Sequence, residues 1–87
     1  MKEFQRATAL EPNDPTAYNN LGGILARKGG LETAINNFEV AIRLKGDFAE
    51  AHFNLGLVLL HKGLRVQSMV EFQKARGLDP RLKAPKM

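Results

Sequence analysis

The two histidines are the side chains in this sequence best suited to acid–base or metal chemistry. His52 and His61 are nine residues apart in a stretch with helical apolar spacing, so they are expected on different faces of one helix. The 87-residue chain has no cysteine to complete a metal site, and no carboxylate pair stands beside either histidine. The glycine pairs at 22–23 and 29–30 follow no strand, so they do not form a phosphate-binding loop. The sequence therefore predicts no enzyme, no cofactor and no metal.

Charge and composition favour a protein partner over nucleic acid or a membrane. The formal net charge is +4, and much of the surplus lies near the end of the chain, at Lys74, Arg76, Arg81, Lys83 and Lys86. Sites for single-stranded nucleic acid combine basic and aromatic side chains, but no aromatic residue follows Phe72. We therefore interpret the basic end as solvated surface. No apolar run approaches the roughly 20 residues that span a bilayer. With no signal-peptide pattern and no cysteine, we expect a cytoplasmic protein.

A 34-residue repeat organises the chain. The stretch AYNNLGGILARKGG runs from 17 to 30, and AHFNLGLVLLHKGL runs from 51 to 64. The same offset aligns three phenylalanines, three alanines and three leucines, which are Phe4, Phe38 and Phe72, Ala7, Ala41 and Ala75, and Leu10, Leu44 and Leu78. A fixed period of this size signals stacked helical units, each too small to bury its apolar face alone.

The apolar spacing predicts five helices, at about 2–10, 15–28, 31–44, 49–62 and 66–77. Asp14 and Pro15 suit the start of the second of these helices. Glycines at 29–30 and at 63 suit the ends of the second and fourth helices. The core stripe of the second helix is expected to contain Ala17, Leu21, Ile24 and Leu25.

Two glycines are expected where paired helices approach closely. Gly22 and Gly56 are predicted to face Ala34 or Ser68 of the partner helix, since a missing side chain lets two helix axes come together. The phenylalanines at 38 and 72 are predicted to fill the remaining space between the helices.

The repeats resemble tetratricopeptide repeats, which share a 34-residue helix-turn-helix pattern. The residues that carry the resemblance are Tyr18, Leu21, Gly22, Leu25, Ala34, Phe38 and Ala41, then His52, Leu55, Gly56, Leu59, Ser68, Phe72, Ala75 and Pro80. The departures are Gly46 for proline, Ser68 for alanine and His52 for an aromatic ring that would pack. The resemblance implies an all-α fold, with antiparallel helix pairs stacked as a short right-handed superhelix of about 2.5 repeats. The expected organisation is one domain, 1–80, made of a half-repeat 2–14 and repeats 15–48 and 49–80, followed by a basic tail, 81–87.

The resemblance also implies that the first helix of each repeat lines a concave groove that binds a peptide or a partner helix. The residues predicted to face this groove are Asn19, Asn20, Gly23, Arg27, Glu50, Phe53, Asn54, Leu57 and His61. Asn20 and Asn54 share one offset, so their amides are expected to hydrogen-bond a bound backbone. Phe53, Leu57 and Leu60 are expected to add an apolar patch. Glu50 argues against binding of chaperone tails, because it would repel their terminal carboxylate.

These features predict that the protein is a protein-interaction module, acting as a scaffold or an adaptor. The alternative is a structural unit that homo-oligomerises through its exposed repeat ends or through the apolar groove. A further alternative is a substrate-recruiting fragment of a larger enzyme. Arg76 occupies the position of Ile42 in the preceding repeat, as expected of a repeat that ends a stack.

Overall fold

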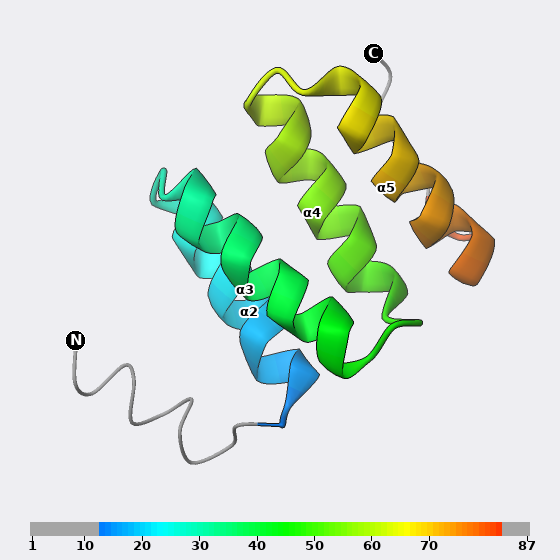
Figure 1. The fold of residues 1–87 in the computed structure, drawn as a ribbon, viewed down its shortest axis with the longest axis horizontal. Helices are drawn as coiled ribbons and strands as arrows, with labels where there is room; N and C mark the ends of the chain where they lie inside the picture. Colours follow the sequence, from blue (N-terminus) through cyan, green and yellow to red (C-terminus); the bar gives the residue numbers. More distant parts are fainter. Residues whose placement is uncertain (1–12, 83–87) are drawn as a thin grey trace.

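The computed structural model describes residues 13–82, which form two helical hairpins packed side by side (Figure 1). The first hairpin contains α2 (Pro15–Arg27) and α3 (Leu31–Leu44), and the second contains α4 (Ala49–His61) and α5 (Arg65–Leu78). This part of the chain has no strand, and its helices lie within one residue of their predicted bounds. The all-α helix-turn-helix architecture is confirmed. The predicted helix 2–10, with Phe4, Ala7 and Leu10, and the tail residues 83–87 lie outside the described residues.

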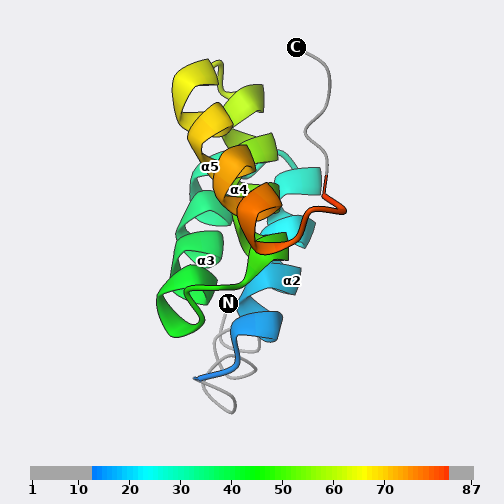
Figure 2. The same ribbon diagram turned by 90° about the vertical axis from the view of Figure 1, so that its right-hand side faces the viewer.

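The four helices form two layers, with α2 and α4 in one and α3 and α5 in the other (Figure 2). Each hairpin packs within itself, and α3 packs on α4 to join the two hairpins. The helices of one layer belong to successive repeats, so α2 and α4 run in the same direction. Within residues 13–82, no helix has both the length and the apolarity to cross a bilayer.

Local sequence signals determine where the helices begin and end. The Asp14 carboxylate accepts hydrogen bonds from the backbone N–H groups of Thr16 (3.0 Å) and Ala17 (3.4 Å), which caps α2 as predicted. Gly29 ends the first helix of its hairpin with φ at +89°, and Gly63 does the same with φ at +84°. These left-handed conformations place the next N–H group against a carbonyl in the last helical turn, as a Schellman motif requires.

Two phenylalanine rings fill the hairpins, and each lies against a glycine. Phe38 is 1% exposed and Phe72 is 5% exposed, which confirms their predicted place in the core. A Cβ atom at Gly22 would lie 2.6 Å from Cε1 of Phe38, and one at Gly56 would lie 2.7 Å from Cε1 of Phe72. A Cβ atom at Gly56 would also lie 3.2 Å from the Ser68 carbonyl oxygen, which agrees with the expected approach of Gly56 to Ser68. At Gly22 the three nearest atoms all belong to the Phe38 ring rather than to Ala34.

One apolar core continues across both hairpins. Leu55, Val58 and Leu59 of α4 form a buried cluster with residues of α3, and half-buried side chains of both helices of the first hairpin pack against it. Ile24 was expected in the core stripe of α2, but it is 48% exposed. Its place on the helix turns it toward the space between α2 and α4 rather than toward α3.

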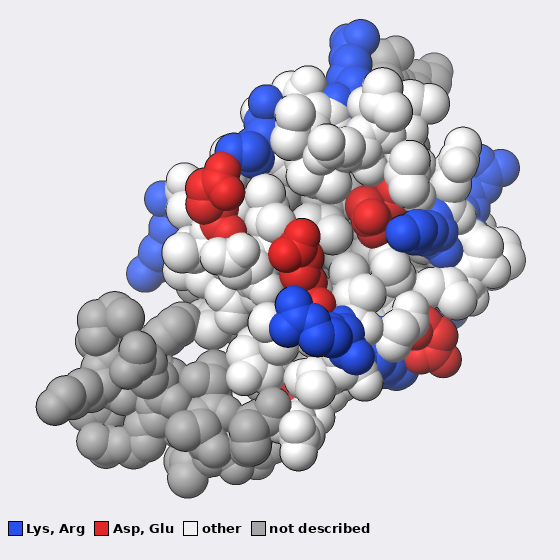
Figure 3. Space-filling model, viewed as in Figure 1, with Lys and Arg blue, Asp and Glu red and all other residues white. Residues whose placement is uncertain are grey.

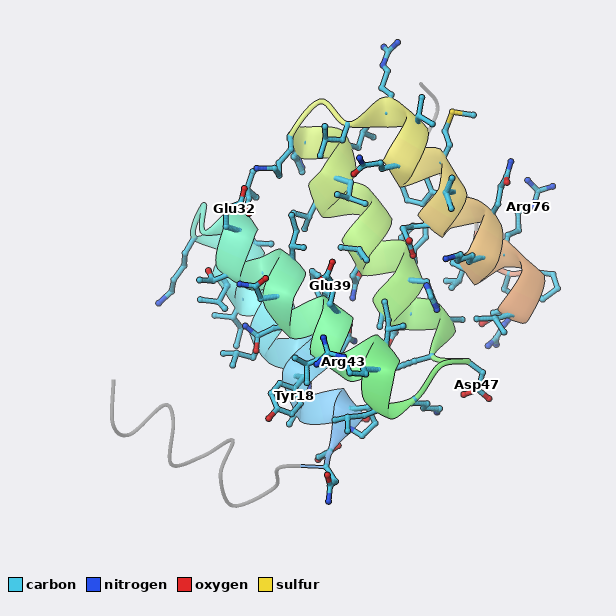
Figure 4. The ribbon with its side chains drawn as sticks, in the orientation of Figure 1. Tyr18, Glu32, Glu39, Arg43, Asp47 and Arg76 are labelled. Atoms are coloured by element: carbon cyan, nitrogen blue, oxygen red, sulfur yellow. The ribbon has the colours of Figure 1, made fainter. Side chains whose placement is uncertain are left out.

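The face drawn in Figure 3 carries basic and acidic side chains, several of them side by side, among neutral ones. Arg76 projects outward from α5 (Figure 4), whereas its counterpart Ile42 packs against the core cluster. Val66, Met69 and Val70 of α5 are also exposed, at 76%, 47% and 43%. The outward face of α5 therefore combines apolar side chains with a cation.

Candidate interaction groove

A cavity of about 640 Å³ lies between α2 and α4, on the layer opposite the face drawn in Figure 3. It is lined by Asn19, Asn20, Gly23, Ile24, Ala26, Arg27, Phe38, Glu50, Asn54, Leu57, Val58 and His61. Eight of the nine predicted groove residues are in this lining, and Phe53 is not. The geometry therefore brings together nearly the whole set that the repeat pattern selected.

The groove is organised as rows of side chains that face each other across it. Because α2 and α4 are equivalent helices of successive repeats, residues 34 positions apart occupy matching places on the two walls. The row at the start of the helices contains Glu50, and the next row contains the asparagines. An aliphatic row follows, and the last row contains Arg27 and His61 at the ends of the two helices.

An amide–amide hydrogen bond joins the two walls. The Asn54 side chain donates through Nδ2 to Oδ1 of Asn19, at 3.0 Å. Asn19 is 4% exposed, whereas Asn20, which was predicted to bind a peptide backbone together with Asn54, is exposed at the rim. The amide of Asn54 keeps its oxygen and a second N–H group, and no other hydrogen bond within residues 13–82 uses them.

The middle of the groove is apolar and open. A Cβ atom at Gly23 would have no neighbour within 4 Å, so the absent side chain leaves free space along α2. Ile24, Leu57 and Val58 border this space, and the ring of Phe38 lies behind it. The sequence reasoning missed Ile24 and Val58 as groove residues, although their shared offset of 34 residues was a usable signal.

The charged rows have no partners in the described part of the chain. Arg27 and His61 are exposed, and so is Glu50 in the first turn of α4. The four ion pairs within residues 13–82 involve none of these three side chains. The charges of Arg27 and Glu50 are therefore not paired with another side chain within residues 13–82.

Phe53 packs inside the second hairpin, which corrects its predicted place in the groove. Its ring centroid lies 5.4 Å from that of Phe72, with the planes tilted by 51°. Phe53 is one position before Asn54, and successive residues of a helix are about 100° apart around the axis, which turns this ring toward α5.

His52 has a structural environment. It is 6% exposed, with Nδ1 2.8 Å from Oε1 of Glu71 and Nε2 donating to the Gly46 carbonyl oxygen at 3.1 Å. It thereby links α4 to α5 and to the preceding loop. Its carboxylate partner was not predictable from the sequence, because Glu71 is 19 residues away and only the hairpin brings it near. Among residues 13–82, no three acidic or histidine side chains converge as a metal site requires.

Two hairpins with one continuous core and an open groove define an α-helical repeat protein. A family model described as a TPR repeat matches residues 22–63, and one described as a tetratricopeptide repeat matches residues 3–36. The chain belongs to the tetratricopeptide repeat family.

Solved structures and curated relatives agree with this assignment. Two crystal structures of MamA match with TM-scores of 0.82 and 0.79 at 34% identity, covering 88% of this chain and 45% and 42% of theirs. The peroxisomal targeting signal receptors of Candida glabrata and Saccharomyces cerevisiae are 37% and 35% identical over 60 residues. That match covers 69% of this chain and only 10% of each receptor. The family and these relatives mark the chain as a protein-interaction module and point to a non-enzymatic role.

Proposed function

We propose that the groove between α2 and α4 binds an extended peptide segment of a partner protein. The observation that carries this proposal is the Asn19–Asn54 hydrogen bond, which holds one amide in place across the groove. An extended segment presents unpaired backbone N–H and C=O groups, whereas the backbone of a helix is already paired internally. The remaining donor and acceptor of Asn54 suit the extended segment, so we favour it over a partner helix.

The open space beside Gly23 supplies the second part of the proposal. A bound segment can approach the wall of α2 closely there, and a side chain of the segment can rest on Ile24, Leu57 and Val58. Backbone hydrogen bonds give affinity in such recognition, while side-chain contacts give specificity. The groove therefore combines a sequence-independent contact with an apolar one.

A tryptophan placed at Gly23 tests this proposal, because it would fill the groove without meeting another atom at its Cβ. Gly77→Trp is the matched control, since Gly77 is also helical, also has no neighbour within 4 Å, and lies on α5 outside the groove. Peptides are selected from a displayed random library on the unmodified protein and measured by fluorescence anisotropy. We expect Gly23→Trp to abolish binding and Gly77→Trp to preserve it. Equal binding by both variants, or no enriched peptide, would refute the proposal.

Self-association through the outward face of α5 is a second candidate, favoured by the exposure of Val66, Met69 and Val70. Met69 of α5 occupies the repeat position of Ile35 of α3, which packs against the core cluster. On α3 this face is covered by α4, whereas the same face of α5 is exposed. A second copy of the chain could supply that helix. Sedimentation velocity should show mass rising with concentration, less so in Met69→Glu than in the exposed control Gln67→Glu. A concentration-independent monomer would exclude this candidate.

A further inference from the structure

The rows of the groove follow an order of charge along its length. Glu50 lies at the end where α2 and α4 begin, and Arg27 and His61 lie at the end where they finish. The amide row and the aliphatic row lie between them. A groove with an anion at one end and a cation at the other distinguishes the two ends of any charged segment placed in it.

The rise of α4 gives the distances between the charged and aliphatic rows of the groove. From Leu57 to His61 the helix rises about 6 Å, and from Leu57 back to Glu50 it rises about 10 Å, at about 1.5 Å per residue. An extended segment advances about 3.3 Å per residue, so these intervals correspond to about two and three of its residues. The complete groove therefore suits a segment of roughly six residues.

We propose that the groove selects an extended segment carrying an acidic side chain, an aliphatic side chain two residues away and a basic side chain about three residues further on. The acidic group meets Arg27 and His61, the aliphatic group rests on Ile24 and Leu57, and the basic group meets Glu50. This inference rests on the proposed function, since it names the chemistry of the segment that the groove would bind.

The charged residues of the groove support this assignment over the reverse placement. An acidic group at the other end would meet the carboxylate of Glu50, and a basic group would meet the guanidinium of Arg27, so both contacts would be repulsive. None of the ion pairs within the described residues neutralises either side chain beforehand. A bound segment therefore need not displace an ion-pair partner that belongs to residues 13–82.

A charge-swap experiment tests the inference with two synthetic peptides. The first is an acetylated and amidated Lys-Ser-Ser-Leu-Ser-Glu peptide with a fluorescent label, and the second has lysine in place of its glutamate. They are measured against the unmodified protein, Arg27→Glu, and the control Arg43→Glu, which makes the same charge change on α3 outside the groove (Figure 4). We expect Arg27→Glu to weaken binding of the first peptide about fivefold or more. The second peptide should regain that affinity on Arg27→Glu and on no other variant.

The outcomes separate this inference from the proposed function. If both charge variants weaken the first peptide equally, or if the second peptide gains nothing on Arg27→Glu, the inference is overturned. It is also overturned if neither the first peptide nor the peptide with the same residues in reverse order binds the unmodified protein. In each of these cases the library-selected peptides still decide the proposed function, through their loss of binding to Gly23→Trp and retention on Gly77→Trp.

Discussion

Two adjacent glycines of α2 should respond in opposite directions to the same substitution. Gly22→Ala places a methyl group 2.6 to 3.0 Å from three atoms of the Phe38 ring, which is 1% exposed and has little room to move. Gly23→Ala places the same group where no atom lies within 4 Å. Because both residues lie within one helix, the change in helix propensity is the same for both.

The magnitudes follow from two opposing effects. Alanine improves helix propensity by about 1 kcal/mol over glycine. Overpacking of a filled core costs about 1–3 kcal/mol, and the short contacts at Gly22 argue for the upper part of that range. We therefore expect Gly22→Ala to lower the free energy of unfolding by about 2 kcal/mol, while Gly23→Ala raises it by at most about 1 kcal/mol. For a domain of this size the midpoints should shift by roughly 8–16 °C downward and 4–8 °C upward.

Thermal and urea unfolding, followed by circular dichroism at the helical band, would measure both variants. The double variant Gly22→Ala with Phe38→Leu tests the cause, because removing the ring relieves the contact. Its loss of stability should be smaller than the sum of the two single losses. If Gly22→Ala stabilised the protein as much as Gly23→Ala, the close packing of ring and glycine would be refuted.

Three further predictions concern polar contacts. Asn54→Ala leaves the buried amide oxygen of Asn19 without its donor and should lower the free energy of unfolding by about 1–3 kcal/mol. The control Asn20→Ala, at an exposed position, should change it by less than about 0.5 kcal/mol, and equal losses in urea unfolding would contradict this prediction. His52→Phe restores the aromatic ring that the repeat pattern expects but loses two hydrogen bonds, so its stability should fall by about 1–3 kcal/mol, and a more stable variant would be evidence against the link. The side-chain hydrogen bond from Arg81 lowers the pKa of Asp79, so Arg81→Ala should raise that pKa toward its ordinary value in an NMR titration. The pair stabilises the fold above the ordinary pKa, and acidification through the lowered pKa removes this contribution; an unchanged titration would exclude the contact in solution.

Helix bounds were predictable because their signals are local. The Asp14 cap with its following proline and the positive φ at Gly29 depend on residues within one turn of the chain. The burial of Phe38 and Phe72 was also predictable, since a 34-residue register repeats the same neighbours in each hairpin. Each of these features needs only short-range chemistry or the repeat itself.

Pairings between helices were less accessible to sequence reasoning. Asn19, Asn20 and Phe53 were all predicted to face the groove, on the side of their helices opposite the core. In the structure Asn19 is buried, Asn20 lies exposed at the rim, and Phe53 packs against Phe72 inside the second hairpin. Neighbouring residues of a helix differ in direction by about 100° around its axis, and this difference separates the three environments. The apolar pattern of a helix extends over several turns and does not predict the direction of a single side chain to that precision.

The sequence by itself determined the repeat and the helices, because glycine, proline and apolar spacing act over short distances along the chain. Most members of the groove followed from the resemblance to tetratricopeptide repeats. Only the tertiary structure decided that Asn19 rather than Asn20 bonds to Asn54, and that His52 meets Glu71. Those contacts depend on how far one helix rotates and slides against another. The Phe38 and Phe72 rings against their glycines constrain that offset within each hairpin, and the apolar core shared by α3 and α4 constrains it between the hairpins.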